Sequence, residues 1–172
     1  MRHLRWTFSL LLGIFLSTGS YAQSNSGTKF LQEAATIGMN AEALGKLGQK
    51  RLENQKTKAY ALELLNKQVV ANAQLKTLAK KKKIKLPEPM SIPINSMQTR
   101  TDSAATDTAA LHFDSEYLDM VIADQKKAIT LFEDGAKLSD KDIKSYASRY
   151  LSVYKKNLEA ALKLSQDTIK KD

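Results

Sequence analysis

The sequence predicts an all-α fold, an up-and-down four-helix bundle in which one long crossover joins the second and third helices. Three observations lead to this fold class. Four stretches carry apolar residues at alternating steps of three and four, which places them on one face of a helix. Short turn signals separate the first stretch from the second and the third from the fourth, whereas a long polar segment lies in the middle. The chain has no cysteine, so its core must hold without disulfide bonds.

The first 22 residues have the pattern of a secretory signal peptide. A basic start precedes an apolar stretch over residues 6–16, and small residues stand at the −3 and −1 positions before Gln23. The apolar stretch is about half the ~20 residues that a membrane-spanning helix needs. We therefore expect cleavage before Gln23, a disordered lead-in over residues 23–27, and export. The periplasm is the expected location, with outer-membrane association or secretion as alternatives.

The first half of the bundle is predicted as two helices joined by a tight turn. The second helix extends over residues 59–87, with Asn54 as its N-cap and Pro87 as its stop. Its buried row is Tyr60, Leu64, Gln68, Ala71, Leu75 and Leu78. The first helix, over residues 28–51, buries Phe30, Ala34, Ile37, Ala41 and Leu44. Glycines also share a stripe on this helix, and because each costs ~1 kcal/mol relative to alanine, they predict a closely approaching neighbour; they are Gly38, Gly45 and Gly48.

Residues 86–113 form the one long connection. They begin with three prolines and continue with many Ser, Thr, Asn and Asp residues. A structureless connection longer than about 15 residues is unusual in a compact domain. It is needed if the second and third helices run parallel, because the chain must then return along the whole bundle. Bundles of the ferritin-like class have one such crossover. The segment has room for a short helix around residues 96–110.

The second half of the bundle is predicted as another pair of helices. The third helix begins with Asp114 as its N-cap and ends at Gly135. The fourth begins after Ser139 or Asp140 and ends near residue 168. The buried row of the third helix is Tyr117, Val121, Gln125, Ala128 and Phe132. That of the fourth is Tyr146, Tyr150, Val153, Asn157, Ala160 and Leu164.

Three of the four helices place one amide side chain in the middle of an apolar row: Gln68, Gln125 and Asn157. In a four-helix bundle these side chains would converge on one buried layer. An unsatisfied buried amide costs ~1–3 kcal/mol, so we expect hydrogen bonds between the amides and to Tyr150 and Tyr154. A buried polar layer of this kind fixes the register of helices at some cost in stability.

The sequence predicts neither a catalytic site nor a cofactor or metal site. After removal of the leader the chain retains one histidine, His112, in the crossover, and it has no thiol. Amides are poor ligands for iron or zinc, and the Glu-x-x-His pairs of di-iron bundles are absent. We therefore expect that the protein is not an enzyme. The alternative is a ferritin-like metal-binding or oxidative-stress protein whose carboxylates turn inward, the candidates being Glu42, Glu63, Asp124 and Glu159.

The second helix ends in a run of lysines: Lys80, Lys81, Lys82, Lys83 and Lys85. Cations in the last turn complement the helix dipole, by ~0.3–1 kcal/mol each when exposed. The alternative interpretation is that these lysines bind an anionic partner, either a polyanion or a membrane surface. The net charge of +9 favours such binding. Nucleic acid is excluded as a partner, because few aromatic residues interleave the lysines and the chain is expected to be exported.

A family resemblance extends over residues 28–165. The segments that carry it are Phe30…Ala34-Ala35…Gly38…Leu44-Gly45-Lys46-Leu47, Asn72-Ala73-Gln74-Leu75…Leu86-Pro87, Phe113-Asp114…Tyr117-Leu118…Met120…Asp124…Ala128-Ile129…Leu131-Phe132-Glu133, and Asp142-Ile143-Lys144…Ala147…Leu151…Leu158. In order and spacing they resemble the bacterial domain-of-unknown-function family 4142. That resemblance implies an exported, ferritin-like four-helix bundle.

The chain departs from this family at the residues that matter most. The resemblance implies histidines at the positions of Gln68, Gln125 and Asn157, and a glutamate at Ala41 or its neighbour Glu42. The three amides found by periodicity thus coincide with the family's histidine positions. The expected function is a non-catalytic, structural or interaction role in the cell envelope, with an unknown envelope partner and a vestigial, metal-free polar layer.

Overall fold

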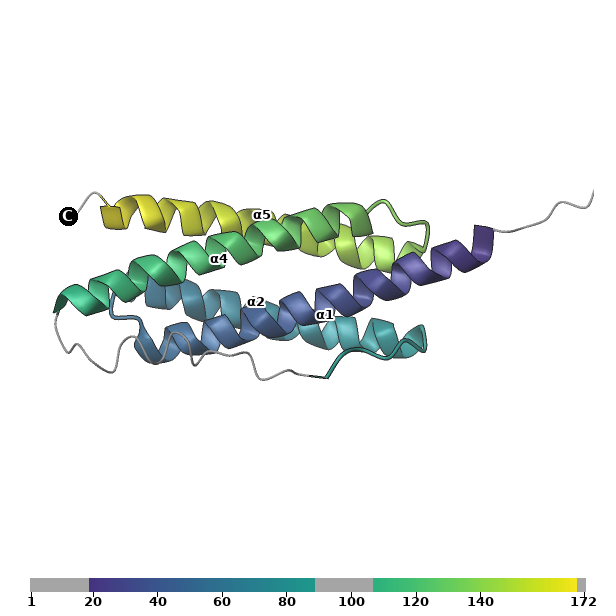
Figure 1. The fold of residues 1–172 in the computed structure, drawn as a ribbon, viewed down its shortest axis with the longest axis horizontal. Helices are drawn as coiled ribbons and strands as arrows, with labels where there is room; N and C mark the ends of the chain where they lie inside the picture. The colour runs from purple at the N-terminus through teal and green to yellow at the C-terminus, as the bar shows by residue number, and fades with distance from the viewer. Residues whose placement is uncertain (1–18, 89–106, 170–172) are drawn as a thin grey trace, which may run out of the picture.

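The computed structural model describes residues 19–88 and 107–169, with side chains described over residues 25–88 and 113–167. It contains four long helices, α1 (Gly19–Arg51), α2 (Gln55–Lys81), α4 (Asp107–Gly135) and α5 (Lys141–Ile169). Figure 1 shows them side by side as an elongated bundle. The predicted all-α four-helix bundle is confirmed. No helix among the described residues is both long and apolar enough to cross a membrane.

The directions of the helices confirm the long crossover. α1 packs chiefly against α2, and α4 packs chiefly against α5. Further contacts between α1 and α4 and between α2 and α5 join the two pairs into one bundle. Phe30 in the first half of α1 makes an edge-to-face contact with Phe132 near the end of α4, and Lys82 after α2 binds Asp140 before α5. Helices α1 and α4 are therefore antiparallel, and so are α2 and α5. Because a short turn also makes α1 antiparallel to α2, α2 and α4 run parallel. The chain must return along the bundle between them, through residues 89–106, which lie outside the described ranges.

The predicted end of the second helix at Pro87 is wrong by six residues. α2 ends at Lys81 because the chain turns at Lys83, which has a positive φ of 58°. The Ile84 N–H then donates to the Ala79 carbonyl at 2.9 Å, and the Lys83 N–H to the Lys80 carbonyl at 3.1 Å. This is the Schellman arrangement of a helix C-terminus. It turns Ile84 back onto the apolar core, a tertiary contact that periodicity does not reveal.

The first helix begins earlier than predicted. Residues 23–27 were expected to be a disordered lead-in, but they lie within α1. Gly27 is buried, and a Cβ atom at this position would lie only 2.9 Å from Ile143 Cδ1 of α5. The contact with α5 places Gly27 inside the bundle.

The turn and cap predictions had different outcomes. Asn54 is the N-cap of α2, and its Oδ1 accepts from the N–H groups of Lys56 and Thr57. Asp140, one of the two candidates, caps α5. Asp114 is not an N-cap, because α4 begins at Asp107. Its buried carboxylate instead accepts from the Asn54 N–H at 2.9 Å, and so ties α4 to the α1–α2 turn. The predicted short helix falls outside the described residues except for 107–110, which open α4.

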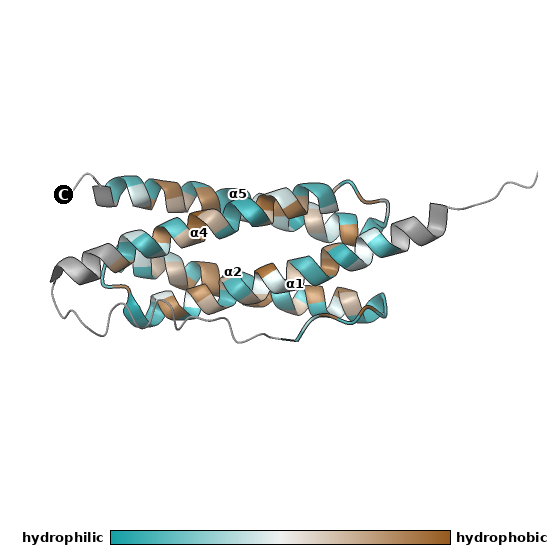
Figure 2. Ribbon diagram, in the orientation of Figure 1, coloured by the Kyte–Doolittle hydropathy of each residue, from teal (hydrophilic) through white to brown (hydrophobic). Residues whose placement is uncertain are grey.

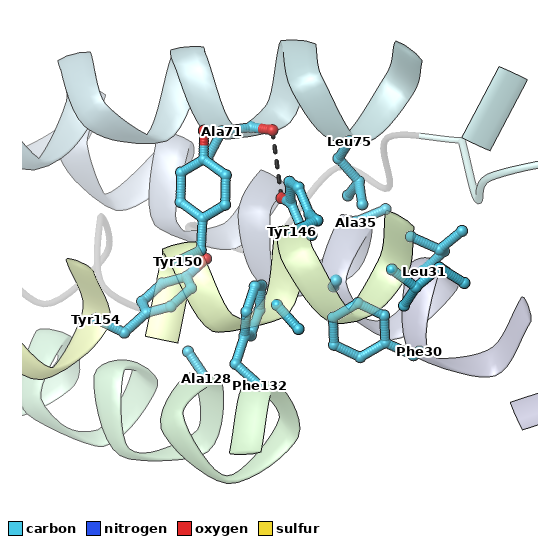
Figure 3. Packing of buried hydrophobic residues seen from close by; sticks show 13 residues of the cluster. Phe30, Leu31, Ala35, Ala71, Leu75, Ala128, Phe132, Tyr146, Tyr150 and Tyr154 are labelled. Carbon is cyan, nitrogen blue, oxygen red and sulfur yellow. Dashed lines mark hydrogen bonds between the residues drawn. The ribbon is translucent and has the colours of Figure 1, made fainter. Parts of the chain in front are cut away.

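The core consists of two apolar clusters at opposite ends of the bundle. The first, which we call the basic-end cluster, contains Phe30, Leu31, Ala34, Ala35, Ala71, Leu75, Ala128, Phe132, Ile143, Tyr146, Ala147, Tyr150 and Tyr154 (Figure 3). The second, the turn-end cluster, contains Leu47, Leu52, Tyr60, Ala61, Leu64, Phe113, Tyr117, Leu118, Val121 and Ala161. Teal and brown residues alternate along each helix in Figure 2, as expected for helices with one buried face.

Candidate functional site, a polar layer between two apolar clusters

Every helix passes from one apolar cluster to the other through a polar or small-residue segment. On α2, Gln68 lies between Leu64 of the turn-end cluster and Ala71 of the basic-end cluster. Gln125 of α4 and Asn157 of α5 occupy the corresponding gaps. All three amides are buried, with at most 4% of each residue exposed. Each of the three predicted amides is therefore buried between the two apolar clusters.

Gln68 is the best-connected member of the layer. Its Nε2 donates to Asn72 Oδ1 at 2.8 Å, and its Oε1 accepts from the Tyr154 hydroxyl at 3.3 Å. Asn72 Nδ2 in turn donates to the Gly38 carbonyl at 3.1 Å and to Glu42 Oε2 at 3.0 Å. This network joins three helices, α5 through Tyr154, α2 itself and α1. The bond to Tyr154 confirms one predicted partner.

Gly38 makes room for this network. A Cβ atom at Gly38 would lie 2.1 Å from Asn72 Oδ1 and 2.9 Å from Gln68 Nε2. The other two glycines of the stripe also face α2, with Leu65 opposite Gly45 and Ala61 opposite Gly48. The predicted close approach is therefore between α1 and α2 of the same chain. Sequence reasoning missed Asn72 as a layer residue, although its position one helical turn after Gln68 was a usable signal.

Asn157 is satisfied differently. Its backbone carbonyl accepts from the Tyr60 hydroxyl at 2.9 Å, and its Oδ1 accepts from Lys67 Nζ at 3.3 Å. Lys67 also forms an ion pair with Glu63 at 2.7 Å. The ammonium group thus reaches the layer from the surface, along the seam between α2 and α5. On the same seam the Tyr146 hydroxyl donates to the Ala71 carbonyl at 3.3 Å (Figure 3).

Gln125 is the exception. The residue is 1% exposed, and its Oε1 has no hydrogen-bond partner among the described residues; the same holds for the Tyr117 hydroxyl. No hydrogen bond joins Gln68, Gln125 and Asn157 to one another within the described ranges, so the expected amide-to-amide bonds do not form there. Gln68 is held by its own helix through Asn72, and Asn157 by Lys67. Tyr150, the second predicted hydroxyl partner, contributes its ring, whose centroid lies 4.7 Å from that of the tilted Tyr146 ring.

The electrostatics of the layer favour neutral phenols. Burial raises the pKa of Tyr154 to about 12, although the hydrogen bond to Gln68 acts in the opposite direction. Burial also raises the pKa of Tyr60, Tyr117 and Tyr146. These hydroxyls are therefore protonated near neutral pH and do not act as bases or nucleophiles.

The four candidate carboxylates do not come together. Glu42 is half-buried, and the hydrogen bond from Lys46 holds its pKa below the usual value, with a further contribution from Asn72. Asp124 is half-buried and its pKa is raised by burial, whereas Glu63 and Glu159 are exposed. No group of three His, Cys, Asp or Glu side chains within the described ranges could hold a metal ion. His112 lies in α4 and not in the crossover.

The donor atoms of the layer do not fit a transition metal. They are amide oxygens, amide nitrogens and protonated phenols, whereas iron and zinc sites use imidazole, thiolate or carboxylate ligands. Among the described side chains, Glu42 is the carboxylate that bonds to a residue of the network around Gln68, and both of its oxygens already accept hydrogen bonds, from Lys46 and Asn72.

The lysine run is divided between paired and exposed side chains. Lys82 binds Asp140 at 2.6 Å and Asp142 at 2.9 Å, and Lys81 binds Asp142 at 2.9 Å. These pairs connect the end of α2 to the start of α5. The other three, Lys80, Lys83 and Lys85, are exposed and form no ion pair with any residue that the structure describes. The predicted run is therefore not one uniform cationic patch.

Comparison with known proteins agrees with this architecture. The protein is similar to the crystal structure of a DUF305 fragment from Deinococcus radiodurans, with a TM-score of 0.66 and 13% identity over 83% of this chain and 96% of that chain. At this identity the similarity shows the fold alone. The search of curated proteins gives no match. The family described as Domain of unknown function (DUF4142) matches residues 16–164. Since the match spans most of the sequence, the chain belongs to the DUF4142 family.

Proposed function

We propose that this protein is a non-catalytic helical bundle of the cell envelope, with a structural or interaction role. One observation carries the proposal. The three positions at which the resemblance implies histidines hold buried amides, and Gln68 is hydrogen-bonded into a network that spans three helices. The layer therefore supports packing and register, and does not assemble a reactive centre.

The chemistry of the layer supports the absence of catalysis. Its hydroxyls are phenols that burial keeps protonated. Its reachable carboxylate, Glu42, has a lowered pKa and accepts from Lys46 and Asn72. A general base needs a pKa near the working pH and access to a substrate, and neither group meets both conditions. Export is proposed from the leader pattern of residues 1–22, which also favours the periplasm.

Elemental analysis of protein purified from the envelope tests the proposal. We expect no stoichiometric iron, zinc or manganese after incubation with each metal and gel filtration. A stoichiometric, tightly held metal would overturn the metal-free layer. In that case Glu42→Gln discriminates the alternative, because a carboxylate-ligated site would lose its metal in this variant.

A gain-of-function variant supplies the matched positive control. Gln68→His, Gln125→His and Asn157→His together restore the residues that the resemblance implies. We expect this triple variant to bind Zn²⁺ or Co²⁺ more tightly than the natural chain, because imidazole is a far better ligand than an amide. If the two proteins bind these metals equally, the replacement of histidines by amides explains nothing about function.

A further inference from the structure

The charge of the bundle is unevenly distributed between its two ends. The half that surrounds the basic-end cluster, residues 25–37, 72–88 and 127–153, holds 12 Lys and Arg against 6 Asp and Glu. The half that surrounds the turn-end cluster, residues 38–71, 113–126 and 154–167, holds 10 against 9. Nearly all of the net positive charge of the described bundle therefore lies in one half.

The unpaired part of this charge sits at the tip of the basic end. Residues 76–85 contain six lysines and no acidic residue. Asp140 and Asp142 pair with Lys81 and Lys82, and the other four lysines are exposed. Of these four, Lys76 lies one helical turn before Lys80, whereas Lys80, Lys83 and Lys85 lie at the end of α2. The last two of these lie beyond the end of α2, where the chain turns away from the helix. Their ammonium groups are consequently free to contact a partner at this tip.

The N-terminus of the described chain is at the same tip. Phe30 makes an edge-to-face contact with Phe132 near the end of α4, and Gly27 lies against Ile143 near the start of α5. Figure 1 shows the first turns of α1 projecting beyond the bundle at this end. The tip that carries the exposed lysines is therefore also the end of the bundle at which α1 begins, and its positive charge is complementary to an anionic surface.

We propose that the basic tip docks on an anionic lipid surface, with Lys80, Lys83 and Lys85 as its contact residues. This inference rests on the proposed export of the protein but not on the metal-free layer. An anionic lipid surface is a suitable partner because each exposed lysine near it raises the affinity about fivefold, and three such lysines act together. The remaining lysines of the run, Lys81 and Lys82, hold α2 against α5 and are not contact residues.

Vesicle co-sedimentation tests the docking. The full chain is purified in the form that the cell exports and mixed with vesicles of phosphatidylcholine alone or with phosphatidylglycerol added. We expect binding to the anionic vesicles only, weakened by salt because exposed charges are screened. The triple variant Lys80→Gln/Lys83→Gln/Lys85→Gln should lose about two orders of magnitude in partitioning, on the scale of fivefold per lysine.

A control variant with the same change in net charge isolates the surface. Lys50→Gln/Lys56→Gln/Lys163→Gln neutralises three exposed lysines of the turn-end half, and we expect it to bind almost as well as the natural chain. Equal losses in the two triple variants would overturn the proposal, since net charge alone would then explain binding. Preference for soluble polyphosphate over vesicles would also overturn it. Circular dichroism on both variants checks that the bundle stays folded, and the metal content of the protein bears on neither outcome.

Discussion

Two tyrosines of the turn-end cluster offer the sharpest test of the buried polar interactions. Tyr60 and Tyr117 are both buried, at 7% and 0% exposure. The hydroxyl of Tyr60 donates to the Asn157 carbonyl at 2.9 Å, whereas that of Tyr117 has no partner among the described residues. Replacing each by phenylalanine removes the same atom from the same cluster. We predict that the two substitutions change stability in opposite directions.

The magnitudes follow from the state of each hydroxyl. Tyr60→Phe loses one hydrogen bond, whose net contribution is ~1 kcal/mol. Tyr117→Phe removes a desolvated and unsatisfied hydroxyl, which costs the native state ~1–3 kcal/mol. For a chain of this size 1 kcal/mol corresponds to about 2–4 °C in Tm. The Tm should therefore fall by a few degrees for Tyr60→Phe and rise by at least as much for Tyr117→Phe.

The assay is urea denaturation followed by circular dichroism, with thermal melting as a second measurement. An unchanged m-value ensures that a shift in midpoint reports stability. Equal destabilisation by Tyr117→Phe and Tyr60→Phe would contradict the prediction. That outcome would mean that the Tyr117 hydroxyl has a partner in solution, such as an internal water that also reaches Gln125 Oε1.

Four further predictions follow from single contacts. Lys83 has a φ of 58°, so Lys83→Gly should raise the free energy of unfolding by ~1 kcal/mol, with Lys83→Ala near zero as its control; no gain for glycine would contradict the Schellman turn. Gly38→Ala places a methyl group against Asn72 Oδ1 and should cost ~1–3 kcal/mol, which thermal melting measures; a wild-type Tm would show that Asn72 can move away. Burial raises the pKa of Tyr154 to about 12, above ~10 in the unfolded chain, so stability should fall as pH rises beyond ~10. Tyr154→Phe should make this alkaline decline shallower without abolishing it, because three other buried tyrosines also contribute; an unchanged decline would count against it. Burial raises the pKa of Asp140, but the hydrogen bonds from Lys82 and from the Ile143 and Asp142 N–H groups outweigh this effect, so its pKa lies below the usual value. The hydrogen bonds from Lys81 and Lys82 likewise lower the pKa of Asp142. The ion pairs of Asp140 and Asp142 therefore stabilise the fold above pH ~4, and this stabilisation is lost as pH falls. Lys82→Met should weaken the acid dependence of unfolding, and an identical acid profile would argue against the pairing.

The buried rows of the helices were predictable because they depend on a local repeat. Gln68 stands four residues after Leu64 and three before Ala71, and this spacing alone placed it in the core. Asn54 was predictable for a similar reason, since an N-cap bonds to N–H groups two and three residues later. Interactions within one helical turn are predictable because they fix the spacing of residue types along the sequence.

The missed features depend on partners that are remote in the chain. Asp114 has the chemistry of an N-cap, yet its carboxylate binds N–H groups about sixty residues away. Lys83 adopts a conformation that favours glycine, because Ile84 gains burial against the core. The partners Gly38 and Lys67 were missed for the same reason, since each lies on another helix than the amide that it bonds.

The polar layer explains how two separate apolar clusters yield one register. Apolar contacts alone tolerate a shift of one helix along another, because a leucine can exchange one apolar neighbour for the next. Asn72 cannot shift in this way, since Gly38 is the position on α1 that leaves room for its amide and offers a carbonyl. The next glycine along α1, Gly45, faces Leu65. A slip would therefore bury an amide without a partner, at ~1–3 kcal/mol, and this penalty selects the observed alignment of α2 on α1.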